Sequence, residues 1–463
     1  MLQRAISSFI FLLLLSAHLS AQQRPAVANN PVGGYIKEGE PAYGDTSNVF
    51  SLNECLRYAL KNQPALNQSY IDESIARTNN AIGFSSWLPQ VNGTANYQHY
   101  FGLPTIFTRF TGTLTPVQSG VTNVSTPAIN VTQNLFNTDV LLAARAAKYN
   151  IQGAKENITA RKIELVTDVS KAFYDLLLSI AQIGVYKEDT ARLIKNQSDA
   201  YNRYVTGIVD KVDYKQATIS LNNSLSRLKT ASESVSAKYA VLKQLMGCPP
   251  DKMFTVSFDT TKMMQEIYTD TLAALHFEKR IEYQLLQTAK RIQRETTLYY
   301  QLGFIPSLSA FYNYNYQFQS NEFADLYKQA YPYSLFGLQL NVPLFTGFRR
   351  NENIHKAKLQ EERIDWDEVN LRLGIYTEYR QNLAAYKSNL YYLRSQASNV
   401  EMAREVYNIV KLQYREGIKA YLDVIIAESD LQTSEVNYLN ALFQLLQSKI
   451  DLEKAMGDIP TNI

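Results

Sequence analysis

The feature that most constrains the fold of this chain is an internal tandem duplication. Four short motifs recur in the same order, namely Trp87–Pro89 as Phe304–Pro306, Asn134–Phe136 as Pro343–Phe345, Tyr204–Gly207 as Tyr414–Gly417, and Leu245–Gly247 as Ala455–Gly457. Each match is weak by itself. Their shared order at a nearly constant spacing predicts two copies of one structural unit.

Part of each copy alternates between two kinds of side chain. In the second copy, one set of positions is Ala310, Tyr312, Tyr314, Tyr316 and Phe318, and Asn and Gln fill most positions between them. A period of two with an aromatic face and an uncharged polar face is typical of a half-buried strand. The same alternation elsewhere predicts two strands per copy, at about 90–135 and about 307–345.

The rest of each copy is predicted to be helical. Residues 137–206 and 346–416 contain no proline, and about 70 residues of continuous helix would span ~105 Å. Each run ends at a glycine, and a shorter proline-free run follows with apolar residues at the coiled-coil period. We therefore expect helices over about 137–247 and 346–456, each region folding as a long helix, a tight turn and a shorter returning helix.

The N-terminus is typical of export. Arg4 precedes an apolar run over 6–15, and Ser20-Ala21 supplies small residues for cleavage. We therefore predict a signal peptide at 1–21, followed by an extended N-terminal periplasmic segment at 22–50. The duplication divides the remainder into repeat 1 (51–250), an inter-repeat segment (251–270), repeat 2 (271–457) and a C-terminal tail (458–463).

Composition excludes several function classes. The net charge of +3 gives no electrostatic reason to bind nucleic acid. The four histidines are scattered and the chain has no phosphate-binding loop of the G-x-x-x-x-G-K-[ST] type. We therefore expect no enzymatic activity, no metal and no cofactor. Cys55 and Cys248 are the two cysteines; they either form a disulfide or stay free as small buried side chains.

The predicted strands raise the question of where they lie. The chain has no apolar run long enough for a helical membrane span, which needs roughly 20 residues. Any membrane-embedded part would therefore be built of strands, and four strands per chain cannot close a barrel without further copies. A periplasmic β-sandwich is the alternative. The Tyr-rich faces, in a chain with 32 tyrosines, favour the membrane because they resemble aromatic girdles.

The first helix and the duplicated motifs of this chain resemble those of a known protein family. Residues 51–66 (SLNECLRYALKNQPAL) resemble the opening helix of the TolC-like outer-membrane efflux proteins. The strand pair, the Leu-Phe pair, the Tyr-x-x-Gly turn with its later Asp, and the Met-Gly ending resemble that family in both copies, over roughly 51 to 457. The resemblance thus covers most of the chain.

The resemblance implies a mainly α protein with a membrane β part. It implies a homotrimer whose four strands per protomer form a twelve-stranded barrel in outer-membrane lipid, continued by a long α-helical barrel in the periplasm. It also implies two further partners, a periplasmic adaptor (membrane fusion) protein and an inner-membrane pump. The function implied is the exit duct of a tripartite efflux or type I secretion system.

The resemblance also implies a channel gate near the periplasmic helix turns. Tyr414 matches the gate tyrosine, Lys419 stands where the family has Arg, and Asp423 matches the first acidic ring. Asp213 matches the acidic latch partner in the first copy, whereas Ile426 replaces the second acidic ring. The alternative is structural, because a helix-start Asp is favoured by the helix dipole and Lys419 with Asp423 is an ordinary i,i+4 pair.

The turns themselves would form the tips that contact the adaptor. These tips are Gly207 with Ile208 and Gly417 with Ile418. A turn glycine that needs positive φ is compatible with that role and explains the glycines without it. For the whole chain, the alternative function is an envelope-spanning coiled-coil structural or adhesion protein without transport activity. Alternating polar strands and glycine hairpins favour the duct.

Overall fold

The computed structural model describes residues 49–110, 113–256, 267–269 and 274–461. The predicted signal peptide at 1–21, nearly all of the predicted segment 22–50 and part of the inter-repeat segment lie outside the described residues. Residues 50–463 form one compact unit, and the architecture below is that of this unit.

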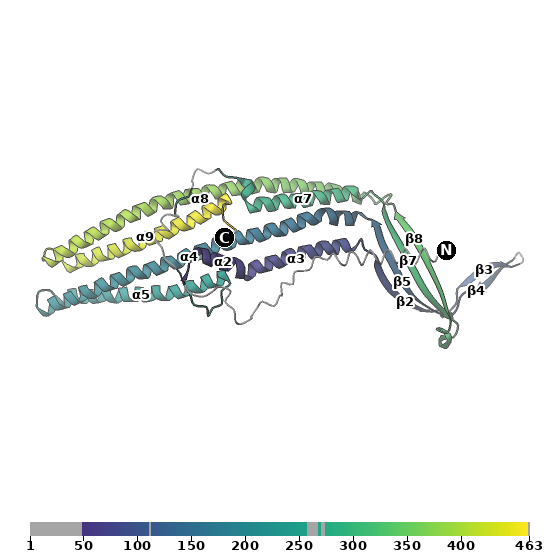
Figure 1. The fold of residues 1–463 in the computed structure, drawn as a ribbon, viewed down its shortest axis with the longest axis horizontal. Coiled ribbons are helices and arrows are strands. Elements are labelled where there is room, and N and C mark those ends of the chain that lie inside the picture. The colour runs from purple at the N-terminus through teal and green to yellow at the C-terminus, as the bar shows by residue number, and fades with distance from the viewer. Residues whose placement is uncertain (1–48, 111–112, 257–266, 270–273, 462–463) are drawn as a thin grey trace. The chain divides into compact units, whose positions relative to one another are not determined.

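Both halves of this unit have the same order of main elements (Figure 1). After the short strand β1 (Val49–Phe50), the first half contains α2 (Leu52–Asn62), α3 (Pro64–Ser85), β2 (Gln90–His99), β3 (Thr105–Phe110), β4 (Thr113–Gln118), β5 (Asn123–Phe136), α4 (Thr138–Val205) and α5 (Lys211–Met246). After β6 (Thr255–Val256), the second half contains η1 (Phe277–Lys279), α7 (Ile281–Leu302), β7 (Ser307–Ser320), η2 (Phe323–Asp325), β8 (Ala330–Asn341), α8 (Arg349–Arg415) and α9 (Tyr421–Met456). The long helix, turn and returning helix predicted for each copy are present.

Local sequence explains where the helices begin and end. Ser51 caps α2, because its hydroxyl accepts from the Glu54 N–H at 3.4 Å while the Glu54 carboxylate accepts from the Ser51 N–H at 2.6 Å. Pro64 opens α3 at a position where its missing N–H has no helical partner. Helices α5 and α9 end at Gly247 (φ 66°) and Gly457 (φ 78°), in the left-handed conformation that glycine adopts readily.

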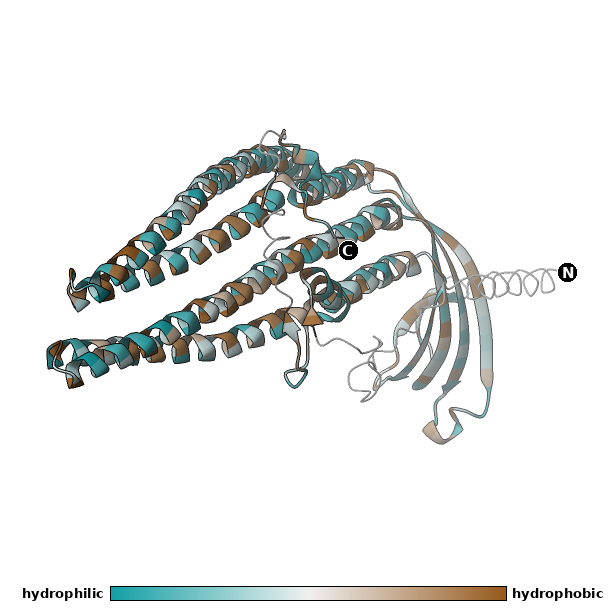
Figure 2. Ribbon diagram, turned by 60° about the vertical axis from the view of Figure 1, so that its left-hand side comes forward, coloured by the Kyte–Doolittle hydropathy of each residue, from teal (hydrophilic) through white to brown (hydrophobic). Residues whose placement is uncertain are grey.

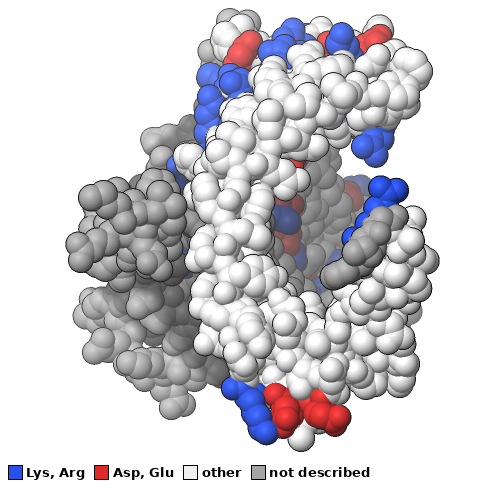
Figure 3. Space-filling view, turned by 90° about the vertical axis from the view of Figure 1, so that its right-hand side faces the viewer, with Lys and Arg blue, Asp and Glu red and all other residues white. Residues whose placement is uncertain are grey.

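Four strands form one antiparallel sheet in the order β2-β5-β7-β8, so the two halves meet at the central pair β5 and β7 (Figure 1). Figure 2 shows the four strands side by side at one end of the helices. None of the four carries Asp, Glu, Lys or Arg. Figure 3 views this end of the unit, where the front surface is uncharged and charged side chains gather at its upper and lower margins.

The two faces of the sheet differ as the alternation predicts. Val131 of β5 pairs with Tyr312 of β7, which pairs with Phe336 of β8, so these apolar side chains share one face. Asn130 pairs with Asn313 on the other face. One exception on this polar face is Phe311, whose ring lies over Gly337 of the neighbouring strand; a Cβ at Gly337 would lie 2.4 Å from the ring.

Two details differ from the sequence prediction. The β3–β4 hairpin lies between β2 and β5, where only a connection was expected, because Arg109 and Pro116 interrupt the alternation that marks the other strands. Strand β8 ends at Asn341 rather than near 345, because Pro343 has no N–H to donate to a ladder.

The helical part holds the core. Helix α4 packs against α7 and α9 of the other half, around fully buried leucines such as Leu176, Leu445 and Leu452. Cys55 and Cys248 lie in this core as free thiols, which is the second of the two alternatives above. Across the described ranges, no helix combines the length and the apolar content that crossing a membrane requires.

Candidate channel gate at the ends of the long helices

The turns that join each long helix to its shorter partner have the same geometry. Gly207 (φ 75°) and Gly417 (φ 78°) both adopt the left-handed conformation, and nothing lies within 4 Å of a Cβ built on either. Glycine is therefore favoured by the backbone angle rather than by crowding. The next residues, Ile208 and Ile418, are 69% and 71% exposed, so each turn presents an apolar side chain at its end.

Asp423 lies in the first turn of α9, and its side chain caps the start of this helix. Its carboxylate accepts a hydrogen bond from the Ala420 N–H at 3.2 Å, and the Lys419 ammonium lies 3.9 Å from it. The Lys419 and Asp423 side chains are 46% and 40% exposed. The structural alternative therefore accounts for this pair within one chain, and such an exposed pair contributes little to stability.

Tyr414 lies in an aromatic and cationic setting between the two repeats. Its ring centre is 5.4 Å from that of Tyr421 and 4.9 Å from the Arg203 guanidinium carbon. Burial raises the pKa of Tyr414, while Arg203 lowers it and Asp213 raises it. Within the described residues, the buried Tyr414 hydroxyl has no hydrogen-bond partner.

The structure brings only some of the predicted gate residues together. Lys419 contacts Asp423, and the charge of Asp213 acts on Tyr414, but no direct bond from Lys419 or Tyr414 to Asp213 occurs in the described part of this single chain. Burial, followed by the charge of Asp210, raises the pKa of Asp213. A latch through Asp213 therefore stays a prediction for the assembled protein.

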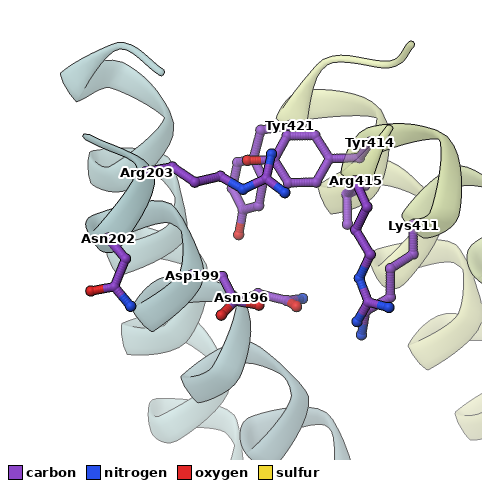
Figure 4. Close-up of a pocket in the computed structure, with 9 residues that line it drawn as sticks. Asn196, Asp199, Asn202, Arg203, Lys411, Tyr414, Arg415 and Tyr421 are labelled. Atoms are coloured by element: carbon purple, nitrogen blue, oxygen red, sulfur yellow. The ribbon is translucent and has the colours of Figure 1, made fainter. Parts of the chain in front are cut away.

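A cavity of about 370 Å³ lies beside Tyr414 (Figure 4). Arg203 reaches across it from α4, while Lys411 and Arg415 project from α8. The other lining residues are Asn196, Asp199, Asn202, Tyr414, Tyr421 and Val424. Sequence reasoning missed these cations, because single Lys and Arg residues along a long helix are indistinguishable from a solvated face.

In the described ranges, no group of three or more His, Cys, Asp or Glu side chains is placed to hold a metal ion. The residues near the turns are exposed charges, tyrosines and apolar tips.

Comparisons with known proteins agree on one family. The model of the outer membrane efflux protein family matches residues 55–248 and 284–458, one segment in each repeat. Outer membrane protein TolC of Vibrio cholerae is 22% identical over 418 residues, covering 88% of this chain and 91% of that protein. Outer membrane efflux protein BepC of Brucella suis is 23% identical over 440 residues, covering 92% of this chain and 88% of BepC.

A solved structure supports the same fold. The outer membrane protein VceC from Vibrio cholerae superposes with a TM-score of 0.68 at 17% identity, covering 88% of this chain and 96% of VceC. The predicted fold class and the outer-membrane location are thereby confirmed. Because the family model spans both repeats, this chain belongs to the outer membrane efflux protein family.

Proposed function

We propose that this chain is the passive exit duct of a tripartite efflux or type I secretion system, assembled as a homotrimer. The observation that carries the proposal is the open sheet β2-β5-β7-β8, whose outer strands β2 and β8 each have one neighbour in the described chain. Unpaired strand edges are not tolerated in hydrocarbon, so other copies must complete the sheet. Three copies supply twelve strands, within the range of bacterial barrels.

The two faces of the sheet fit this role. The face with Val131, Tyr312 and Phe336 would meet lipid, and the face with Asn130 and Asn313 would line water. Uncharged amides in a lumen permit passage without strong binding. Since the chain has no nucleotide-binding loop, the energy for export would come from an inner-membrane pump acting through a periplasmic adaptor.

The mass of the detergent-extracted outer-membrane protein tests the assembly. We expect three chains per particle. A monomer that stays in solution without detergent would contradict the duct.

A second experiment tests the adaptor contact. Cysteines replacing the exposed Ile208 and Ile418 should form cross-links to a periplasmic adaptor in cells. Cysteine at Ile219, which is 60% exposed on α5, is the matched control and should not. Equal cross-linking from all three positions would reject the tips as the contact.

We further propose that Asp423, three copies of which would meet at the periplasmic mouth, gives the channel a modest cation preference. An anionic ring acts over about one Debye length, ~8–10 Å at moderate salt. Asp423→Ala should weaken cation preference in single-channel recordings, and Lys419→Ala should raise resting conductance by loosening a latch to Asp213 and Tyr414. The exposed pair Lys229–Glu233 is also spaced i,i+4, so Glu233→Ala is the control. Unchanged selectivity in Asp423→Ala would leave the residue as a helix cap only.

A further inference from the structure

Charged side chains from both repeats meet in the seam between α4 and α9, further along the helices than the gate. Asp189 of α4 is 2% exposed, while Glu428 and Glu435 of α9 are 3% and 9% exposed. Arg192, one turn beyond Asp189 on α4, extends between them. Buried carboxylates are rare unless they are paired, so this cluster requires an explanation.

Arg192 is shared among all three carboxylates without bonding fully to any. Its nitrogens lie 3.6 Å from Asp189, 3.5 Å from Glu428 and 3.9 Å from Glu435. These distances exceed those of a good charge-assisted hydrogen bond. Accordingly, four buried atoms of the cluster have no hydrogen-bond partner within the described chain, namely Nε and one terminal nitrogen (Nη2) of Arg192, Oε1 of Glu428 and Oε2 of Glu435.

The three carboxylates differ in what else supports their charge. Asp189 accepts hydrogen bonds from the Ser224 hydroxyl of α5 at 2.7 Å and from the Gln432 amide of α9 at 2.6 Å. Glu435 accepts from the Arg404 guanidinium of α8 at 3.0 Å.

Glu428 is the least supported of the three, since it has one neutral donor, the Asn196 amide of α4, at 2.9 Å. When three carboxylates share one guanidinium, a proton binds most readily to the carboxylate whose ionised form has the fewest hydrogen bonds and nearby positive charges. In the folded seam that member is Glu428.

We propose that Glu428 is a proton-controlled link between the two repeats, holding α4 and α9 together when protonated and releasing them when it ionises. An ionised Glu428 would be a charge at 3% exposure beside Asp189 and Glu435, and separating the helices would return it to water. Ionisation therefore favours the separated arrangement. Helix α9 begins at Tyr421 and carries Asp423 of the predicted gate in its first turn. Separation of α4 from α9 at this seam would therefore widen the gate.

The electrostatic surroundings agree with this assignment. Burial, followed by the charge of Asp189, raises the pKa of Glu428 to about 7, against the opposing effects of Arg192, the Asn196 hydrogen bond and Lys411. The other charged or titratable groups around the seam are Glu435 and Tyr421 on α9, Arg404 on α8, and Arg227 on α5, which donates to Gln432.

The sign of the effect follows from linkage. The pKa of Glu428 rises from 4.5 in water to about 7 in the closed seam, so the closed state binds the extra proton and is favoured at low pH. Raising the pH from 4.5 to above 7 should lower the closed-to-open ratio by up to about 300-fold per protomer. Opening should increase between pH 5 and 7.5 and then level off.

Two readouts on the full-length protein test this inference, which rests on the proposed duct only for its effect on conductance. The first is the distance between spin labels on exposed positions of α4 and α9, Ile194 and Thr433, measured from pH 5 to 8.5. The second is single-channel conductance over the same range. Wild type should show a longer label distance and a higher conductance as pH rises.

Glu428→Gln, which cannot ionise, should hold the short distance and low conductance throughout. Glu156→Gln is the matched control, because Glu156 is also a buried carboxylate between the repeats, bonded by Thr288 of α7 at 2.9 Å; it should respond like wild type. A pH response retained in Glu428→Gln, or no distance change in wild type, would overturn the link. A distance change without a conductance change would show that the link does not widen the gate. A distance change in a protein that forms no conducting channel would leave the link standing and contradict the proposed duct.

Discussion

Replacing the buried Arg280 by Met should release the end of α9 locally. Arg280 precedes α7, and its side chain is 5% exposed. Its guanidinium donates to the Ala455 carbonyl at 3.0 Å, to both oxygens of Glu282 at 2.9 and 3.2 Å, and to Glu378 at 2.8 Å. One side chain therefore ties the start of α7 to the end of α9 and to the middle of α8.

The loss of stability expected in Arg280→Met depends on which partners of Arg280 stay buried. Glu282 and Glu378 are 42% and 40% exposed, so water would take over their hydrogen bonds and their pairs contribute little. The carbonyl of Ala455, a residue that is 0% exposed, would lose its charged donor, which costs about 1.5–3 kcal/mol. We expect local opening of the last turn of α9 to become easier by about 2–3 kcal/mol.

Hydrogen exchange of the protein in detergent measures this opening. A loss of about 2–3 kcal/mol lowers protection of amides over 450–456 by roughly 30- to 150-fold. Lys279→Met is the matched control, because the neighbouring Lys279–Asp458 pair (2.7 Å) has side chains 53% and 41% exposed and contributes at most about 1 kcal/mol. Unchanged protection in Arg280→Met, or an equal loss in Lys279→Met, would refute the reasoning.

Two more predictions concern α8 and the sheet. The hydrogen bond from Lys290 lowers the pKa of Glu368 to about 2, so ionised Glu368 stabilises the fold above pH 4.5 and this contribution is lost as pH falls toward 2. Glu368→Gln should therefore flatten the dependence of the melting temperature on pH between pH 5 and 2.5. A dependence as steep as that of wild type would reject this prediction. Gly337→Val should push the Phe311 ring off the polar face and lower single-channel conductance, and adding Phe311→Ala should restore it; no change in conductance would place that face away from the lumen.

The sequence predicted the sheet and the long helices because each has a strong periodic signal. Strand β7 alternates over most of its length, with Phe311 as the exception, and carries no charge, and α4 and α8 contain no proline. The hairpin β3–β4 lacked such a signal, since its alternation is broken by Arg109 and Pro116.

The polar cluster in the α4–α9 seam could not be predicted for a different reason. Glu428, Gln432 and Glu435 are spaced as a solvated helix face would be, and only packing against Asp189 and Arg192 of the distant α4 buries them. Pairing over such sequence separations leaves no local pattern. The predicted gate residues were likewise located by family resemblance, and their roles stay predictions.

The two outer strands of the sheet come from different repeats, β2 from the first and β8 from the second. A chain that joins another through these edges makes a head-to-tail contact, which leaves one β2 edge and one β8 edge free at every stage of growth. Assembly therefore has a polarity, like that of a filament, and it stops only when the last free pair of edges meets. A substitution that changes the twist of β2 or β8 would accordingly yield open arcs that keep recruiting chains.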